Sequence, residues 1–285
     1  MQLSIDTLTY AGTVLLSALG FRLVYITGRF FHFAHAATIP AGAYCAWWLM
    51  GSGLPVALAG IFSVLVVGVV GSVSFLALLA PMKQRGAGPQ MLLLASLALY
   101  LLAQHALAIG FGDDARTLMA GIGPVWSLAG ARSTGAQLLL IGASLVTALL
   151  MWFMEVRSRA GTRLVAVAEH QELSRIFGIH VIRVQAVAFA VGSGIGALLG
   201  VLIAADQSFS PNMGFQWLLP GVVAVLVGGV WSIPRVVLAA LLIAILRVAA
   251  IWFLGSAWQN VFVYVLLFTC FIVWSSTLTS VTRRS

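Results

Sequence analysis

Charged residues are scarce in this sequence, and lysine is almost absent. Of the 285 residues only 8% are Asp, Glu, Lys or Arg, and Lys83 is the single lysine. A soluble domain normally carries about a quarter charged residues, because its surface must be hydrated. Too few charges are present to cover a globule of this size, so lipid must solvate most of the surface. The composition excludes an ordinary soluble protein and predicts an integral membrane protein with several spans.

Cysteine is nearly absent as well, and the N-terminus lacks basic residues. Cys45 and Cys270 both fall inside apolar segments, so we interpret them as small buried hydrophobic residues and not as a disulfide. The first ten residues, MQLSIDTLTY, contain no Lys or Arg. A cleaved signal peptide begins with a basic region, so none is expected here.

Acidic residues are missing from the interiors of the apolar stretches. All seven lie at predicted span ends or in loops: Asp6, Asp113, Asp114, Glu155, Glu169, Glu172 and Asp206. Proton or sodium coupling typically uses Asp or Glu within the membrane. This distribution disfavours an ion-coupled secondary transporter or channel, which remains the alternative function. The five histidines lack the spacing of metal ligands, and no nucleophile–base pattern supports a membrane-embedded enzyme, so neither a metal site nor a catalytic residue is predicted.

What the sequence does contain is a series of apolar stretches. A helix needs about 20 apolar residues to cross the hydrocarbon core. The candidate spans are Leu8–Ile26, Phe30–Met50, Val56–Ala80, Met91–Phe111, Gln137–Met154, Val184–Ala204, Leu218–Val230, Val236–Leu254 and Val261–Trp274. The seventh is short and rich in glycine. The predicted fold is an all-α transmembrane bundle of eight or nine segments, some short or interrupted, in a single domain over residues 1–285.

Basic residues concentrate in two loops. Pro81–Pro89 carries basic residues without an acid, and Glu155–Arg183 carries five arginines against three acids, whereas Gly112–Ala136 is nearly neutral. Two spans separate the basic loops, so both can face the cytoplasm, as the positive-inside rule requires. If Leu218–Val230 spans the membrane, Arg283 and Arg284 also fall inside, and the N-terminus lies outside. The net charge of +8 is explained by membrane topology and not by nucleic-acid binding.

Glycine, proline and histidine cluster in two of the spans. The stretch RFFHFAHAATIPAGAY contains His32, His35 and Gly42, and LLPGVVAVLVGGVWSIPR contains Gly228 and Gly229. Small residues let helices approach closely, so one interpretation is packing, with the histidines buried and hydrogen-bonded. The other is that interrupted helices expose backbone groups along a translocation path. These five residues are therefore candidates for the path.

Two arginines fall within or near spans. Arg22 lies close to the predicted inner end of its helix, and we expect its side chain to reach the membrane surface. Arg247 lies nearer the middle of its segment. A buried arginine usually faces the interior of the bundle, so Arg247 either satisfies backbone carbonyls or lines the path.

The second basic loop contains a polar stretch with helix-forming residues, LVAVAEHQELSRIFGIHVIRV. Thr162 can cap a helix here and Gly178 can end it. Leu173, Ile176 and Phe177 share one side, which gives the second half a small apolar face. Such a helix serves either as a connector lying on the membrane or as a ligand for a groove on a soluble partner.

Part of this stretch resembles a known loop. ELSRIFG, Glu172 to Gly178, resembles the E-A-A-x-x-x-G cytoplasmic loop of bacterial ABC importer permeases, with Leu173 and Ser174 in place of the two alanines. The surrounding GTRLVAVAEHQELSRIFGIHVIRVQAVAFAVGSGIGALLGVLIA is similar to branched-chain amino acid permeases of the LivH/LivM family. LVYITGRFFHFAHAATIPAGAY resembles the N-F-A-H-G and G-A-Y region of that family, and SPNMGFQWLLPGVVAVLVGGVWSIPR resembles its P-x-M-G and G-G-x-G-S-x-P elements. The chain length and Phe33-Ala34-His35 favour the LivH type.

The resemblance implies a function. A permease of this kind forms the translocation path for branched-chain or related amino acids, or within the same family for urea, amides or another small polar solute. ATP would be hydrolysed by separate cytosolic ATPase subunits, and this chain would bind no cofactor; it lacks a G-x-x-x-x-G-K-[ST] phosphate loop. The residues expected to contact the ATPase are Glu172, Leu173, Arg175, Ile176, Phe177 and Gly178, within a coupling loop at about 155–183.

Further partners follow from the same resemblance. They are a second permease, either LivM-like or another copy of this chain, and a periplasmic binding protein that delivers the cargo. Asp206–Trp217 and Gly112–Ala136 are the outer loops on which that protein could dock. The expected location is the bacterial cytoplasmic (inner) membrane.

The chain also departs from the other two motifs of the family at three positions. His32 replaces the asparagine of N-F-A-H-G, and Ala36 replaces its glycine. Trp231 replaces a small residue between Gly228-Gly229 and Ser232. Because a tryptophan cannot pack as a glycine does, we expect altered packing at that point and room for a different cargo.

Overall fold

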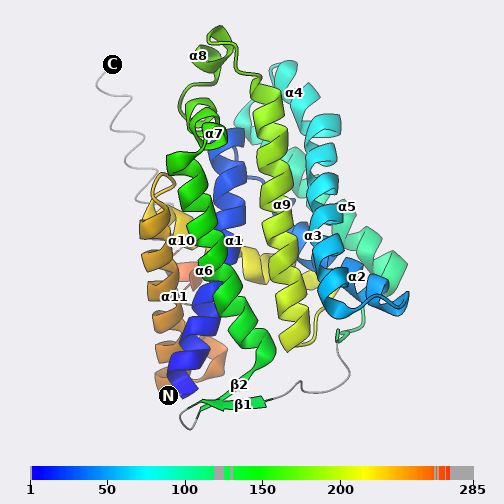
Figure 1. Cartoon of the computed structure of the whole chain (residues 1–285), viewed down its shortest axis with the longest axis vertical. Coiled ribbons are helices and arrows are strands. Elements are labelled where there is room, and N and C mark those ends of the chain that lie inside the picture. The colour runs from blue at the N-terminus through cyan, green and yellow to red at the C-terminus, as the bar shows by residue number, and fades with distance from the viewer. Residues whose placement is uncertain are drawn as a thin grey trace.

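The computed structural model describes residues 2–118, 125–128, 131–259, 261, 263–266 and 268–269 as a bundle of long helices with one short hairpin (Figure 1). The helices are α1 Gln2–Gly28, α2 His35–Gly51, α3 Val56–Ser74, α4 Ala80–Gln84, α5 Pro89–Phe111, α6 Gly135–Arg157, α7 Arg159–Glu169, α8 Gln171–Ile176, α9 Val181–Asp206, α10 Gly214–Gly228 and α11 Ile233–Leu254. A π-helical turn, η1 (Phe75–Leu79), joins α3 to α4, and short 3-10 turns form η2 (Pro211–Met213) and η3 (Ser256–Trp258). Strands β1 (Val125–Leu128) and β2 (Ala131–Thr134) pair antiparallel, with Val125 opposite Thr134.

Seven helical stretches are long and apolar enough to cross a membrane. They are α1, α3 to α4 (Val56–Gln84), α5, α6, α9, η2 to α10 (Pro211–Gly228) and α11. The eighth long helix, α2, has 17 residues and so a length of about 26 Å. The prediction of a multi-span helical bundle is confirmed. The ninth predicted segment, Val261–Trp274, falls largely outside the described residues, as do Cys270, Arg283 and Arg284.

The predicted starts of the first two spans were wrong. α1 begins at Gln2 and not at Leu8, so its polar first turns are helical. α2 begins at His35 and not at Phe30, because Arg29 has a positive φ of 62° and the residues after it do not form a helix. Sequence hydropathy reports how apolar a residue is and not whether its backbone is helical, so it missed the polar first turns of α1 and included the non-helical residues before α2.

Glycines pack α9 against its neighbours at the centre of the bundle. A Cβ atom at Gly200 of α9 would lie 1.9 Å from the carbonyl oxygen of Ile39 in α2, and one at Gly42 of α2 would lie 2.4 Å from that of Ala197 in α9. Backbones that approach this closely leave no room for a side chain. Gly42, a predicted path residue, therefore packs α2 directly onto α9.

The two ends of the bundle differ in charge. Both basic loops lie at the end that carries α4, α7 and α8, which we call the basic end; the hairpin and the N-terminus lie at the opposite, hairpin end (Figure 1). Ten of the fifteen basic residues belong to the basic end or the helix halves next to it: Arg22, Arg29, Lys83, Arg85, Arg157, Arg159, Arg163, Arg175, Arg183 and Arg235. Only three acids, Glu155, Glu169 and Glu172, accompany them. The shared end of the two loops confirms that part of the predicted topology.

Candidate coupling surface and buried polar network

The polar stretch forms two helices that protrude from the basic end. α7 begins at Arg159, where the hydroxyl of Ser158 accepts a hydrogen bond of 2.9 Å from the backbone N–H of Gly161. The chain leaves the helical conformation at His170 (φ −143°, ψ 95°) and resumes as α8. The prediction of one helix capped by Thr162 was therefore wrong. The cap lies four residues earlier, and the helix is broken at His170.

Gly178 ends α8, as the sequence indicated. Its φ is +76°, and its N–H donates to the carbonyl oxygen of Arg175 at 3.0 Å. The N–H of Ile179 donates to the carbonyl oxygen of Ser174 at 2.9 Å. These are the two bonds of a Schellman motif, in which glycine takes the left-handed conformation at no steric cost. The turn fixes the direction in which the last residues of α8 point.

The apolar face of α8 is exposed. Leu173 is 49% exposed, Ile176 79% and Phe177 76%, and we call these three residues the apolar patch. Next to it lies a groove of about 660 Å3. The residues that line this groove are Arg29, Glu169, His170, Gln171, Glu172, Leu173 and Ile176. Of the six residues predicted to contact an ATPase, the structure gathers Glu172, Leu173 and Ile176 along the groove and places Arg175, Phe177 and Gly178 beside them in sequence.

The α7–α8 segment is anchored on the end of α1. The guanidinium of Arg29 donates from Nη2 to the carbonyl oxygens of Ala168 and Glu169, the latter at 3.0 Å. The amide of Gln171 donates to the carbonyl oxygen of Thr27 at 2.9 Å. The amide of Gln185 in α9 donates to the same oxygen at 2.7 Å. Two segments more than 130 residues apart are thus joined by hydrogen bonds that the sequence did not reveal.

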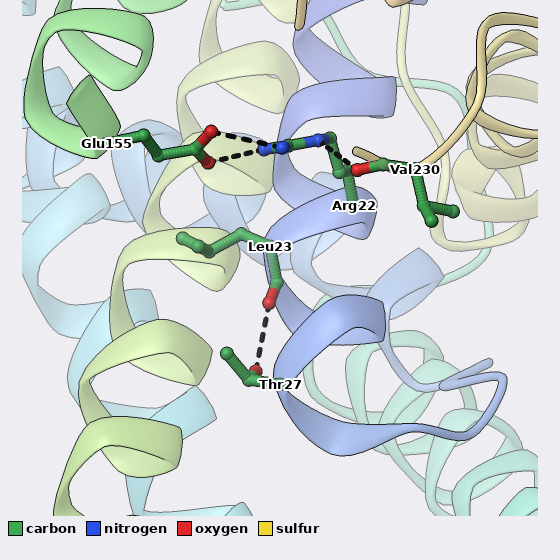
Figure 2. A network of polar contacts seen from close by, with 5 residues as sticks. All are labelled: Arg22, Leu23, Thr27, Glu155 and Val230. Atoms are coloured by element: carbon green, nitrogen blue, oxygen red, sulfur yellow. Dashed lines mark hydrogen bonds and ion pairs between the residues drawn. The ribbon is translucent and has the colours of Figure 1, made fainter. Parts of the chain in front are cut away.

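A buried ion pair lies inside the same end of the bundle (Figure 2). Arg22 of α1 donates to Glu155 of α6 through Nη1 at 2.5 Å and Nη2 at 3.0 Å, and its Nε donates to the carbonyl oxygen of Val230 at 2.7 Å. Arg22 is 1% exposed. The prediction that its side chain reaches the membrane surface was wrong, because the last turns of α6 and the turn after α10 close over it.

The predicted histidines lie in the core. His32 is 4% exposed and His35 1%. A Cβ atom at Gly20 of α1 would lie 2.9 Å from Nε2 of His35, and one at Gly196 of α9 would lie 3.5 Å from its Cε1. Within the described part of the chain, neither ring nitrogen of His35 has a hydrogen-bond partner. The hydrogen-bonded interpretation therefore does not describe His35, whose ring is held by packing between α1 and α9.

The other path candidates lie apart from the histidines. Gly228 packs on the start of α11, where a Cβ atom would lie 2.7 Å from the Arg235 carbonyl oxygen, and Gly229 (φ +81°) forms the turn. Arg247 lies in the half of α11 toward the hairpin end, 3.8 Å above the ring of Tyr10, and donates to Oε1 of Gln259 at 2.9 Å. Among the described contacts Arg247 binds a side chain and an aromatic ring and no backbone carbonyl.

A groove of about 840 Å3 lies between α3 and α6 and is also lined by residues of α9. Its walls are mostly aliphatic, and include Ile61, Leu139 and Leu202. At the hairpin end, the hydroxyl of Thr134 donates to Asp206 at 2.7 Å. None of the six predicted path residues is among the described residues that line it.

Comparison with protein families decides the class. A model of the family described as branched-chain amino acid transport system / permease component matches residues 3–271. The chain belongs to this family. It is a multi-pass transport permease, as the resemblance at its motifs implied.

Individual permeases of the family are distant in sequence but match over nearly the full length. The high-affinity branched-chain amino acid transport system permease protein LivH of Salmonella typhimurium is 21% identical, and that of Escherichia coli 22%, over 96% of this chain and 93% of theirs. BraD of Pseudomonas aeruginosa is 24% identical over 94% of this chain and 91% of its own. A chain of PsaBC from Streptococcus pneumoniae, solved in complex with Fab, aligns with 95% of this chain over 91% of its own length. The two share the fold, with a TM-score of 0.54 at 12% identity.

One of the departures from the family pattern lies outside the core. Trp231 lies in the turn between α10 and α11 and is 50% exposed. Its ring lies beneath the guanidinium of Arg29, with 5.6 Å from Cζ to the ring centroid. Trp231 therefore lies at the basic end, against Arg29, and not in the core around His32 and His35.

Proposed function

We propose that this permease is the membrane-spanning subunit of an ABC importer in the bacterial cytoplasmic membrane, with its basic end in the cytoplasm. That end carries ten basic and three acidic residues, and this excess of positive charge supports a cytoplasmic orientation. The observation that carries the proposal is the apolar patch on α8. Three large apolar side chains stand in water at the end where a cytosolic partner would bind.

The partner we propose for the patch is an ATPase subunit. Exposed apolar residues next to a groove mark sites of protein association. Phe177 and Ile176 would insert into a cleft of the ATPase, in the mode by which an amphipathic helix binds a groove. Glu172 and Arg175 would form the polar rim, Leu173 would complete the apolar contact, and Gly178 would hold the turn that presents them.

The energy for transport would come from that contact. In this proposal the chain binds no cofactor and carries out no covalent chemistry; the partner subunits bind and hydrolyse ATP. Their closure would move the α7–α8 segment and shift the bundle between two states, one open to each side. The residues proposed for the path remain His32, His35, Gly42, Gly228, Gly229 and Arg247, with Gly228 and Gly229 at the turn where α10 and α11 meet.

The remaining partners would bind elsewhere. A second permease, LivM-like or a second copy, would complete the path across the bilayer. A periplasmic binding protein would dock on the hairpin end, over Asp206–Trp217 and the parts of Gly112–Ala136 that the structure describes. The names of the similar permeases support branched-chain amino acids as the cargo.

Reconstitution tests this proposal. The permease is placed in proteoliposomes with its second permease, ATPases and binding protein, and uptake of radiolabelled leucine is measured with and without ATP. Uptake should require both ATP and the ATPase chains. Parallel assays with other amino acids, amides and urea identify the cargo. Uptake driven by a proton or sodium gradient through this chain alone would instead establish an ion-coupled transporter.

A further inference from the structure

Arg29 occupies a position that joins three parts of the basic end. It follows directly after α1, its Nη2 donates to the carbonyl oxygens of Ala168 and Glu169 at the end of α7, and its guanidinium lies over the ring of Trp231. Trp231 is in the turn between α10 and α11. One side chain thus connects the protruding segment to the turn between α10 and α11, two helices that pack against α1.

The contacts of Arg29 with the α7 carbonyl oxygens and with Trp231 are of kinds that a guanidinium forms well. The last carbonyls of a helix carry partial negative charge and have no partner within the helix, so a guanidinium binds them well. The flat guanidinium can at the same time stack on an aromatic ring, which a lysine ammonium does less well. Each contact occupies a different part of the Arg29 side chain, and both can hold together.

The backbone at Arg29 indicates that its position is specifically maintained. Arg29 has a φ of 62°, the left-handed conformation that a residue with a long side chain rarely adopts. Among the described residues it is the one non-glycine residue with positive φ. Its N–H donates to the Tyr25 carbonyl oxygen at 2.9 Å, which keeps the turn closed on α1. Because strain of this kind persists only where surrounding contacts hold it, the contacts of the side chain have to compensate it.

We propose that Arg29 is the positioning residue through which movement of the docked α7–α8 segment reaches α10 and α11. A shift of the α7 carboxyl end moves the guanidinium, and the guanidinium carries Trp231 and its turn with it. Gly229, which has a φ of +81° and open space where a Cβ atom would lie, is the residue of that turn at which the backbone can pivot. The inference rests on the proposed ATPase contact, and it assigns a role to Trp231 that a small residue could not fill.

The test measures docking and transmission separately in the complete importer. The variants are Arg29→Gln, Trp231→Leu and Trp231→Phe, with Arg85→Gln as the matched control, because Arg85 is exposed and lies at the same end. Three quantities are compared: co-purification of the ATPases, the rate of ATP hydrolysis, and substrate taken up per ATP hydrolysed. Arg29→Gln and Trp231→Leu should keep the ATPases bound and hydrolysing, while uptake per ATP falls by about tenfold, within the range of measured couplings between sites.

Trp231→Phe keeps an aromatic face under the guanidinium and should retain most of the uptake per ATP. Arg85→Gln should match the parent protein. If uptake per ATP is unchanged in both Arg29→Gln and Trp231→Leu, Arg29 transmits nothing and the inference is wrong. If Arg29→Gln releases the ATPases, Arg29 belongs to the docking surface and the inference is also wrong. The proposed ATPase contact is tested separately. If a variant of the apolar patch still retains the ATPases, that contact is wrong, whatever the result for Arg29.

Discussion

Replacing Glu155 by leucine is expected to lower the free energy of unfolding by about 3–5 kcal/mol, because it leaves Arg22 as an unpaired charge in the core. The side chain of Arg22 is 2% exposed and that of Glu155 12%. Removal of Glu155, the less buried partner, leaves the more buried charge of Arg22 unpaired. Glu155→Leu should therefore lower the free energy of unfolding more than Arg22→Met does. The measurement is reversible unfolding of the purified permease in mixed detergent micelles.

The double variant Arg22→Met with Glu155→Leu provides the decisive comparison. It removes both charges and replaces them with apolar groups of similar size, which for buried ion pairs is often neutral. Its free energy of unfolding should therefore lie closer to the parent than that of Glu155→Leu alone. Arg85→Gln, which removes an exposed charge, serves as the control and should change stability little. A double variant as unstable as the sum of the two single variants would show that the pair does not act as a unit.

Replacing Phe177 by alanine is expected to weaken binding of the ATPase by about 100-fold, since a buried aromatic anchor in an interface typically contributes 2–4 kcal/mol. Phe177 lies between the end of α8 and Gly178, and the two hydrogen bonds of the Schellman turn join backbone atoms of other residues, so the alanine variant should retain the turn. The dissociation constant is measured between the permease in nanodiscs and the purified ATPase.

The chain offers a closely matched control for this experiment. Phe253 is 79% exposed, against 76% for Phe177, but lies at the hairpin end of α11. Phe253→Ala should leave the dissociation constant unchanged. Equal binding of the Phe177→Ala and parent proteins, or equal weakening by both alanine variants, would reject the apolar patch as the docking surface.

The spans and the apolar face of α8 were predictable because both depend on local sequence. A membrane helix must be apolar along about 20 residues, and an amphipathic turn repeats its apolar residues every three or four positions. Leu173, Ile176 and Phe177 follow that spacing, and the structure exposes all three. The end of α8 at Gly178 was predictable for the same reason, since glycine is the residue that favours this turn.

The break at His170 and the position of Arg22 depend on tertiary contacts and could not be predicted locally. The residues around His170 favour a continuous helix, yet hydrogen bonds from Arg29 and Gln171 hold α7 and α8 separately on the end of α1. Arg22 and Glu155 are 133 residues apart. A rule that places an arginine at the membrane surface has no information about a carboxylate so distant in the chain.

The most direct test of the account is the side of the membrane on which α8 lies. Ile176→Cys and Ser4→Cys are introduced separately into a protein without Cys45 and Cys270, and inner-membrane vesicles are treated with a maleimide that cannot cross lipid. Ile176→Cys should react in inside-out vesicles and stay unlabelled in right-side-out vesicles, and Ser4→Cys, at the hairpin end, should show the reverse. Labelling of Ile176→Cys in right-side-out vesicles would place α8 away from ATP and contradict the proposed function.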